Sequence, residues 1–559
     1  MAKYVIGVDF GTLSARAIMV DVCTGEERAS CEYRYPRGIF DETLPGSTVR
    51  LKPLSALQDP SDYSEGLVWL LREVLQISGV EPQAVVGIGL DATASTMLPV
   101  NERYVPLCHD ETFRGNPHSW IKMWKHHSAH EQASHMLDVA VQRKERFLQN
   151  CGGRISAEWM FPKIYETLCL APDVYKSAYR FMEVADWLVF LLTGRETHNS
   201  CMAGFKAMWS PRNGYPSSEY FRAVDERLSD IVEQKMSPVA KVGEKAGGLT
   251  LVMSEKTGLL PGTAVGVANT DGHHILAALG ITGSSQLAII LGTSIIHMLA
   301  NEKEIMVSGV GSIVEDGLLP GYFGYETGQP AAGDMLAWFV ENMLPSTCHK
   351  LANQAGLSVF QWLEKEATKL SPGSNGILAL DWWNGNRSVL ADMELSGLIV
   401  GLTLQTRSEQ IYRALLESMA FGTKLIIENY RTHGIKIDRL VACGGIAYKS
   451  QLTMQIFADV IGLPIAISKS TQTPALGAAM YGACAAGKSA GGVDTIFEAS
   501  SQMARLQPDI YMPDNGNHTL YCTLYKKYEW LYDCFGKKNK NLMAELKGLS
   551  SRESVCEYE

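Results

Sequence analysis

The chain has 559 residues, 46% hydrophobic and 20% charged, with a formal net charge of −10 from 50 Lys and Arg against 60 Asp and Glu. One hydrophobic core rarely grows beyond about 250–300 residues, so we expect two large domains. The acidic balance, without a basic cluster, argues against nucleic acid or an anionic membrane as the main partner.

The cysteines and the N-terminal segment indicate a cytoplasmic protein. The 12 cysteines are scattered and none forms a CxxC pair, which predicts neither a zinc site nor a disulfide framework. Unpaired thiols fit a reducing compartment. The opening MAKYVIGVDFGT is interrupted by Asp9 and Gly11, so it lacks the apolar core of a signal peptide. There is no run of about 18 apolar residues, so no membrane span is expected.

The opening predicts a β-hairpin with a polar turn. Residues 4–9 and 16–22 are β-rich, and a turn from Gly11 to Ser14 separates them. A Gly-Thr turn presents backbone N–H groups and a hydroxyl to one point, which suits phosphate oxygens. Asp9, at the strand end, is a candidate to hold Mg²⁺ through water. The alternative is an ordinary hairpin with a polar turn.

The rest of the first half predicts mostly helices. A helix near 63–77 is followed by a strand at 84–96 that ends in a polar loop, and then by helices at 117–150, 156–170 and 180–193. A turn-rich stretch over 239–265 suggests a domain boundary at about 265. We therefore expect one domain over 1–265 and a second over 266–559.

The second half opens like the first. Strands at 286–291 and 295–299 flank a turn that contains Gly292 and Thr293. This weak internal duplication suggests two loops that hold one polyphosphate from both sides, in a cleft between the domains.

Asp271 follows a strand-like run, GTAVGVA, just after mid-chain. An Asp at a cleft mouth can accept a proton from an attacking hydroxyl, which phosphoryl transfer requires. The alternative is a helix N-cap, with Thr270 or Asp271 preceding HHILAALG. The adjacent His273 and His274 lack a third ligand at a useful spacing for a metal.

The later elements are a helix at 407–430, a strand that ends at Gly444-Gly445, a helix at 449–461, a strand in PIAISKS and an Ala-rich helix in ALGAAMYGACAA. The Gly-Gly pair leaves space for an adenine or a ribose, although a plain strand-to-helix turn is the alternative.

Two further patterns favour structural interpretations. Residues 482–489 match GxxxxGK[ST] but follow a helix-like run, so Gly487 is predicted to end a helix and not to open a phosphate loop. His126 and His130 are four residues apart, yet a solvated helix face is the better interpretation than a metal site.

Together these motifs resemble the FGGY family of carbohydrate kinases, from Tyr4 to about Ala486. Within the family, the segments are most similar to those of members that phosphorylate L-ribulose. These segments are GIGLDATAST (87–96), NPHSWIKMWKHHSAHEQA (116–133), GGRISAEWMFPKI (152–164), AGFKAMW (203–209), GYETGQPAAGDMLAWF (324–339) and LDWWNGNR (380–387).

The resemblance implies an α/β fold of two actin-like (ribonuclease H-like) domains, with mixed sheets flanked by helices and an active-site cleft between them. It implies transfer of phosphate from MgATP to the C5 hydroxyl of L-ribulose in arabinose catabolism. The expected partner is a small sugar, with no nucleic acid and no membrane, and a homodimer is compatible with it.

The resemblance also implies a role for each site residue. Asp271 would be the general base, and Asp9 would anchor Mg²⁺. The sugar would be bound by Lys206, Glu326 and the backbone at Ala94. One side of the phosphates would be bordered by Gly11, Thr12, Ser14 and Arg16, and the other by Gly292 and Thr293. The nucleoside would be bordered by Gly333, Gly444, Gly445 and Lys449.

Two alternatives stay open at this point. One is a related kinase for D-ribulose, xylulose or a polyol such as ribitol. The other is a non-catalytic sugar or nucleotide sensor, or a chaperone-like ATPase. The presence of Asp9, Asp271 and both Gly-Thr turns argues against an inactive protein, and the segment beyond 505 is too short for a chaperone's substrate module.

Overall fold

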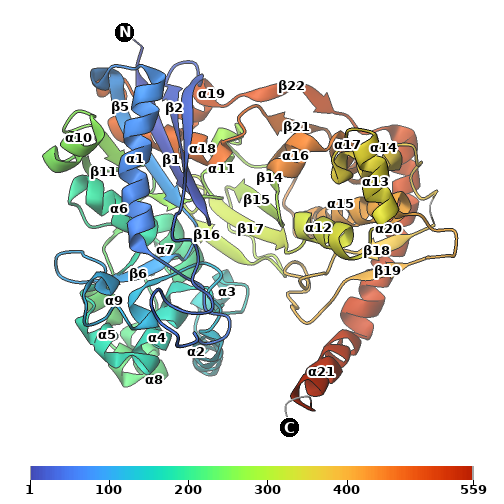
Figure 1. Cartoon of the computed structure of the whole chain (residues 1–559), viewed down its shortest axis with the longest axis horizontal. Coiled ribbons are helices and arrows are strands. Elements are labelled where there is room, and N and C mark those ends of the chain that lie inside the picture. The colour runs from blue at the N-terminus through green and yellow to red at the C-terminus, as the bar shows by residue number, and fades with distance from the viewer. Residues whose placement is uncertain (1, 375, 557–559) are drawn as a thin grey trace.

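The computed structural model describes residues 2–374 and 376–556. Two large mixed sheets flanked by helices make up most of it (Figure 1). The predicted α/β class with two sheet-containing parts is therefore confirmed. In the described part of the chain, no helix is long and apolar enough to cross a membrane.

The first sheet contains the predicted N-terminal hairpin. Its strand order is β11-β12-β5-β1-β2-β3, with β13 paired to β5. β1 is antiparallel to β2 and parallel to β5. The strands are β1 (Tyr4–Phe10), β2 (Ser14–Asp21), β3 (Glu27–Arg34), β5 (Val85–Ala92), β11 (Lys245–Gly248), β12 (Ala264–Gly266) and β13 (Asn269–Thr270).

The second sheet repeats this plan. Its order is β22-β21-β20-β14-β15-β17-β16, and β14 is antiparallel to β15 and parallel to β20. The internal duplication seen in the sequence is thus a duplication of topology. The strands are β14 (Gln286–Leu291), β15 (Ile295–Asn301), β16 (Ser312–Glu315), β17 (Phe323–Gln329), β20 (Arg439–Cys443), β21 (Ile465–Ser468) and β22 (Leu506–Tyr511).

A layer of three helices separates the two sheets (Figure 1). Apolar side chains of both sheets pack on this layer, among them Val5 and Ile18 from the first sheet and Met298 and Val441 from the second. The buried apolar surface joins the two sheets through one shared core. The helices are α11 (Ile275–Ala278), α18 (Thr473–Ala486) and α19 (Ile496–Met503).

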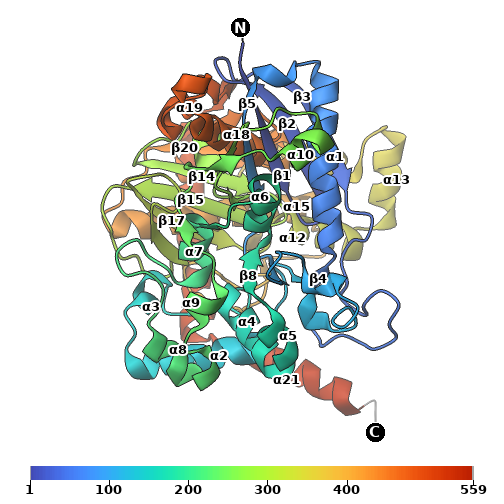
Figure 2. The same cartoon turned by 90° about the vertical axis from the view of Figure 1, so that its left-hand side faces the viewer.

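Other helices cover the outer faces of the sheets. α1 and α6 pack on the first sheet, and α15, α17 and α20 surround the core of the second. A smaller helical part, built on α2, α4 and α8, forms its own core below the first sheet (Figure 2). The bounds are α1 (Pro60–Ser78), α2 (His130–Arg143), α4 (Met160–Leu170), α6 (Val184–Thr193), α8 (Ser218–Val224), α15 (Ser408–Thr432), α17 (Gln451–Ile461) and α20 (Asn515–Asp533).

Three helix predictions need correction. Residues 120–129 contain no helix and follow a single 3₁₀ turn at Pro117–Ser119; β7 (Ile121–Lys122) pairs there with β4 (Leu57–Gln58) and β6 (Met97–Val100). The predicted helix at 156–170 begins only at Met160, and the one at 180–193 begins with a strand, β8 (Arg180–Glu183). At Ile121–Lys122 and Arg180–Glu183 the pattern misled because these short strands are largely buried, and burial on both faces removes the polar alternation of a strand.

The two structural interpretations had different outcomes. Gly487 ends α18 with a φ of 71°, so the stretch that matches a phosphate loop is a helix C-terminus as predicted. The solvated-face interpretation is wrong for His126, which is buried and precedes α2.

The domain boundary near residue 265 stays a prediction. β13 is the last strand of the first sheet, and the second sheet starts with β14 at Gln286.

Glycines let α18 lie directly on the first sheet. A Cβ added to Gly89 in β5 would lie 1.8 Å from the Ala478 carbonyl oxygen, and one added to Gly7 in β1 would lie 1.8 Å from the Ala475 carbonyl oxygen. The contacting atoms belong to the helix backbone, which side-chain motion cannot relieve.

We therefore expect Gly89→Ala to destabilise the protein by about 1–3 kcal/mol or more, because the helix must move off the sheet. Thermal or urea unfolding measures the effect. The matched control is Gly115→Ala, since a Cβ there meets no atom within 4 Å. Equal stability of the two variants would contradict the close packing of α18.

Candidate active site

Three carboxylates gather where neighbouring strands of the first sheet end. Asp9 is opposite Asp91 in the β1–β5 pair, and Asp91 is opposite Asn269 in the β5–β13 pair. Asp271 comes directly after β13, and its backbone N–H donates to the Ala92 carbonyl, 3.0 Å away. Because β5 is parallel to both partners, these acidic side chains meet at one edge of the sheet.

Asp271 has the environment of a proton acceptor. Its Oδ1 accepts a hydrogen bond from the backbone N–H of Gly272 at 2.7 Å. Burial and the nearby Asp9 carboxylate raise the pKa of Asp271 to about 7. The N-cap alternative is wrong, because the helix that follows begins only at Ile275 and no side chain caps it.

Asp9 fits a cation site. It is buried, and its Oδ1 has no hydrogen-bond partner among the described residues. Burial and the neighbouring Asp91 raise the pKa of Asp9 well above its usual value, a penalty that a bound cation would relieve. The described residues contain no cluster of three or more His, Cys, Asp or Glu that could hold a metal directly. This donor set fits an ion that keeps most of its water, as Mg²⁺ does.

Each Gly-Thr turn is closed by a backbone hydrogen bond from its glycine, but the first turn is one residue longer than the second. In the first, the Gly11 N–H donates to the Ser14 carbonyl at 3.0 Å, and in the second the Gly292 N–H donates to the Ser294 carbonyl at 2.9 Å. The Oγ1 of Thr12 accepts from the Trp124 indole at 3.1 Å.

Ser14 and Arg16, which were also predicted to border the phosphates, both contact the side chain of Glu32. The Ser14 hydroxyl and the Arg16 guanidinium both contact the Glu32 carboxylate in β3, at 2.9 and 3.0 Å. A phosphate would therefore have to compete with Glu32 for Arg16. The Gly11 N–H is likewise engaged, with the Ser14 carbonyl.

The predicted nucleoside residues meet beside the second turn. α12 (Gly333–Asn342) starts there, and the Gly333 N–H donates to the Gly292 carbonyl at 3.1 Å. A Cβ on Gly333 would lie 2.7 Å from the Gly292 oxygen, so only glycine fits without a shift. The neighbouring Ala332 and Asp334 N–H groups donate to the carbonyl of Thr293.

The Gly-Gly pair lies on the adjacent strand end. Gly444 has a φ of 97°, and a Cβ there would lie 2.4 Å from the Leu291 carbonyl oxygen. A Cβ on Gly445 would meet nothing within 4 Å, so the backbone is open on that side. Lys449, at the end of α16 (Gly445–Lys449), is exposed. These features fit a flat nucleoside against the Gly-Gly backbone.

Lys206 and Glu326 form a polar pair near Asp271. Lys206 lies in the last turn of α7 (Ser200–Ala207), and its Nζ is 3.7 Å from Oε2 of Glu326 in β17. The same Oε2 lies 2.9 Å from Nε2 of His273, whose Nδ1 is 2.9 Å from the Cys201 thiol.

Neighbouring charges set the protonation states of Glu326 and His273. Burial opposes ionisation of Glu326, but Lys206 and His273 hold its pKa well below the usual range. Burial likewise opposes a charge on His273, but contacts with Cys201 and Glu326 raise the pKa of His273 to about 9. The carboxylate of Glu326 is thus charged and lies beside Lys206. The binding of the sugar's hydroxyls and carbonyl by these two residues stays a prediction.

A buried lysine holds the loop that contains Ala94. Ser95, the next residue, has a φ of 52°, which is unusual for a residue with a side chain. The Lys163 ammonium donates to the carbonyls of Ser95 and Met123, at 2.6 Å each. Burial lowers the pKa of Lys163 to about 7. The lysine ties the backbone beside Ala94 to α4.

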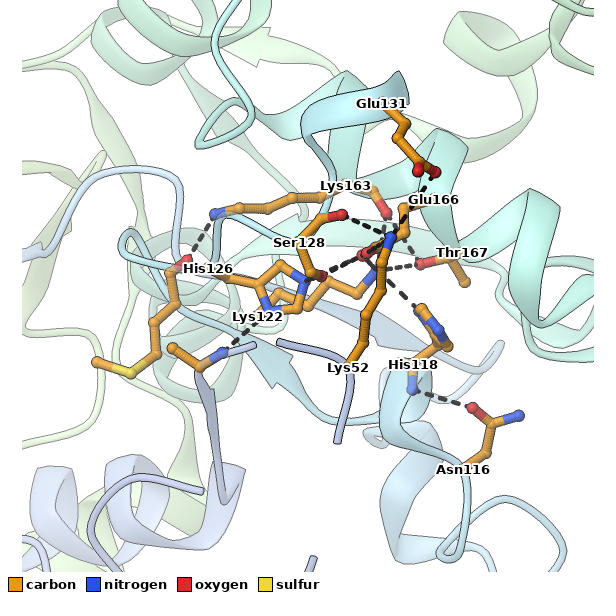
Figure 3. A network of polar contacts seen from close by, with 12 residues as sticks. Lys52, Asn116, His118, Lys122, His126, Ser128, Glu131, Lys163, Glu166 and Thr167 are labelled. Atoms are coloured by element: carbon orange, nitrogen blue, oxygen red, sulfur yellow. Dashed lines mark hydrogen bonds and ion pairs between the residues drawn. The ribbon is translucent and has the colours of Figure 1, made fainter. Parts of the chain in front are cut away.

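A second network on α4 fixes that helix (Figure 3). The Glu166 carboxylate accepts from Lys122 at 2.8 Å and from the Ser128 hydroxyl, and lies 2.9 Å from Nε2 of His126. Nδ1 of His126 accepts from the Ala56 N–H at 3.1 Å, so Nε2 carries the proton. His126 is therefore a structural residue that connects the chain before α2 to α4.

Sequence reasoning did not identify Lys163 or His273 as site residues. Lys163 and Glu166 are one helical turn apart in the otherwise apolar run MFPKIYETLCL, and such a buried ionisable pair is a usable signal. For His273 no such signal exists, because its partners come from distant segments.

Comparison with known proteins agrees with this arrangement. The model of the FGGY family of carbohydrate kinases, N-terminal domain, matches residues 4–280, and the model of the C-terminal domain of that family matches residues 287–486. A Ribulokinase of Geobacillus thermodenitrificans is 48% identical over 98% of this chain and 97% of its own length. A Ribulokinase of Halalkalibacterium halodurans is 46% identical over 98% of both chains.

Solved structures share the fold at low identity. A ligand-bound xylulose kinase from Lactobacillus acidophilus has a TM-score of 0.76 at 17% identity, covering 96% of this chain and 99% of its own. A Plasmodium falciparum glycerol kinase with ADP has a TM-score of 0.73 at 16% identity, covering 94% and 97%. These neighbours support the two-domain sugar-kinase fold.

Proposed function

The chain belongs to the FGGY family of carbohydrate kinases, and from that membership we propose that it transfers the γ-phosphate of ATP to the C5 hydroxyl of L-ribulose. The product is L-ribulose 5-phosphate. The relatives named Ribulokinase, 46–48% identical over nearly the whole chain, support ribulose as the acceptor. The observation that carries the proposal is the position of Asp271, which has Glu326 and Asp9 as charge neighbours.

In this proposal Asp271 accepts the proton of the attacking hydroxyl. A pKa of about 7 makes its carboxylate both available and basic enough near neutral pH. Lys206 and Glu326 orient the sugar by bonds to its hydroxyls, with the backbone at Ala94 beside them. A pocket whose buried polar groups must be paired rejects analogues that lack those hydroxyls.

The phosphate side of the proposal rests on the two turns. Gly11 and Gly292 shape the turns, the N–H groups and hydroxyls of Thr12 and Thr293 hold the phosphate oxygens, and Gly333, Gly444, Gly445 and Lys449 border the nucleoside. Asp9 would hold Mg²⁺ through water, and the ion would supply positive charge to neutralise the phosphates. Closure of the two halves of the chain excludes water, so that phosphate goes to the sugar.

The free thiols fit a reducing compartment. Every cysteine whose side chain the structure describes is unpaired. We therefore place the enzyme in the cytoplasm, where it would act in arabinose catabolism.

A coupled ADP-release assay tests the proposed function. With MgATP we expect strong turnover of L-ribulose, and weaker turnover of D-ribulose, D- and L-xylulose, ribitol, L-arabinitol and glycerol. Turnover with only another acceptor would keep the kinase and overturn L-ribulose as its substrate. Absence of sugar-stimulated ADP release would overturn the kinase activity and favour the sensor alternative.

A further inference from the structure

One arginine side chain reaches the strand that carries Glu326 from the first half of the chain. Arg154 lies between α3 (Phe147–Asn150) and α4. Its Nη2 is 3.3 Å from the position that a Cβ on Gly311 would take. The Gly311 N–H in turn donates to the Glu326 carbonyl at 3.2 Å. The Arg154 guanidinium therefore lies beside the strand that carries Glu326, and the Glu326 charge acts on it.

A second arginine reaches the same strand from the other half of the chain. The Arg387 side chain lies across Gly328, with Cδ 3.7 Å and Nη1 4.0 Å from the position of a Cβ there. Gly328 is two residues beyond Glu326 in β17, so both face the same side of the sheet. The Arg387 Nη2 is 4.0 Å from the Glu158 carboxylate, which is too long for a hydrogen bond.

The Arg154 guanidinium lacks an acceptor. It is half-buried, and among the described residues it makes no hydrogen bond or ion pair. Burial and the charge of Arg387 lower the pKa of Arg154, which reflects the cost of two adjacent guanidinium groups. A guanidinium has five N–H donors and no acceptor, and a donor left unpaired away from water costs free energy.

Glu326 is close to both the proposed base and the arginines. Its charge acts on Asp271 together with that of Asp9, and on Arg154 together with those of Arg387 and Glu158.

The chemistry of the proposed substrate calls for an acceptor beside the arginines. In the furanose ring of a ketopentose, O5 is bonded to C2, so a free C5 hydroxyl exists only in the open-chain form. That form carries a C2 ketone, which accepts hydrogen bonds and donates none. With the C5 hydroxyl at Asp271, the rest of the chain extends past Glu326 toward the arginines.

We propose that Arg154 and Arg387 form a subsite for the C2 carbonyl oxygen of the open-chain ketopentose, and that this subsite selects ketoses over the matching polyols. The inference rests on the proposed function of the site. A carbonyl oxygen offers only lone pairs to the guanidinium N–H groups. A C2 hydroxyl brings a hydrogen that these donors cannot accept.

The test compares L-ribulose with ribitol and L-arabinitol, the two alcohols that reduction of its C2 ketone gives. In Arg154→Met, the kcat/KM for L-ribulose should fall roughly ten- to hundredfold, the usual effect of losing a hydrogen bond to a charged group. The values for the two alcohols should change little, so the ketose-to-polyol ratio should fall. Arg387→Met should change the ratio in the same direction.

The matched control is Arg212→Met. Arg212 is an exposed arginine that pairs with Glu304 and Glu315 on the outside of the same region, so its loss should leave the ratio unchanged. If Arg154→Met fails to fold, Arg154→Lys keeps the charge but not the fork of donors, and the ratio should again fall.

The outcomes separate this inference from the proposed function. Equal losses for ketose and polyols, or an unchanged ratio in both arginine variants, would overturn the carbonyl subsite while wild-type turnover of L-ribulose still supports the kinase. If the wild-type enzyme phosphorylates neither ketose nor polyol, the proposed function fails and the subsite fails with it.

Discussion

An Asp271→Asn variant should lose about 10²–10⁴-fold in kcat, the contribution of a general base to proton transfer. Asparagine has nearly the same shape, and its amide oxygen can still accept from the Gly272 N–H, which donates to Oδ1 at 2.7 Å in the structure. It cannot take a proton at neutral pH. We therefore expect KM values for sugar and ATP within a few-fold of wild type, so that the loss falls on the chemical step.

Steady-state kinetics with L-ribulose and MgATP measure this effect. Thermal unfolding of the variant serves as the check that the fold is retained. Asp138→Asn is a suitable control, because Asp138 is an exposed acid on α2, far along the chain from the carboxylate cluster. Near-normal turnover by Asp271→Asn would remove Asp271 from the role of base.

An Asp9→Asn variant should lose on the order of 10²-fold in kcat at moderate magnesium, since charge neutralisation by the metal supplies several kcal/mol in phosphoryl transfer. The Asp9 Oδ1 has no protein partner in the described residues, so the amide would break no hydrogen bond at that atom. Removing the charge of one of two buried, adjacent acids should leave the fold as stable as before or more so.

A magnesium titration separates this role from a structural one. The half-saturating Mg²⁺ concentration should rise in Asp9→Asn, and high Mg²⁺ should recover part of the activity. A variant with reduced kcat but an unchanged Mg²⁺ requirement would contradict metal anchoring. The Asp138→Asn control should show the wild-type titration.

The sequence was most informative where function depends on local backbone. The Gly-Thr turns at Gly11 and Gly292 each join two strands that are adjacent in the chain, so alternation and turn residues identify them. Asp271 was also found locally, because it follows a strand-like run. The structure was needed to exclude the N-cap, because the helix begins only at Ile275. The role of Asp271 as base stays a prediction.

What could not be predicted depends on contacts between distant segments. The helix at Thr473–Ala486 was expected, but nothing in its Ala-rich sequence tells that it packs on the first sheet through Gly7 and Gly89. Burial likewise reversed the interpretation of His126, which pairs with Glu166 from another element. Arg154 is part of a conspicuous segment, yet its approach to Glu326 appears only once β17 is in place.

The most direct test of the account is to identify the phosphorylated product. After reaction of MgATP with L-ribulose, ³¹P NMR should show one phosphate monoester coupled to two methylene protons, in equal amount to ADP. ¹³C NMR should show a free C2 ketone, because a sugar blocked at O5 cannot close the furanose ring. Inorganic phosphate alone would contradict the kinase, and an ester whose sugar still forms the furanose ring would contradict phosphorylation at C5.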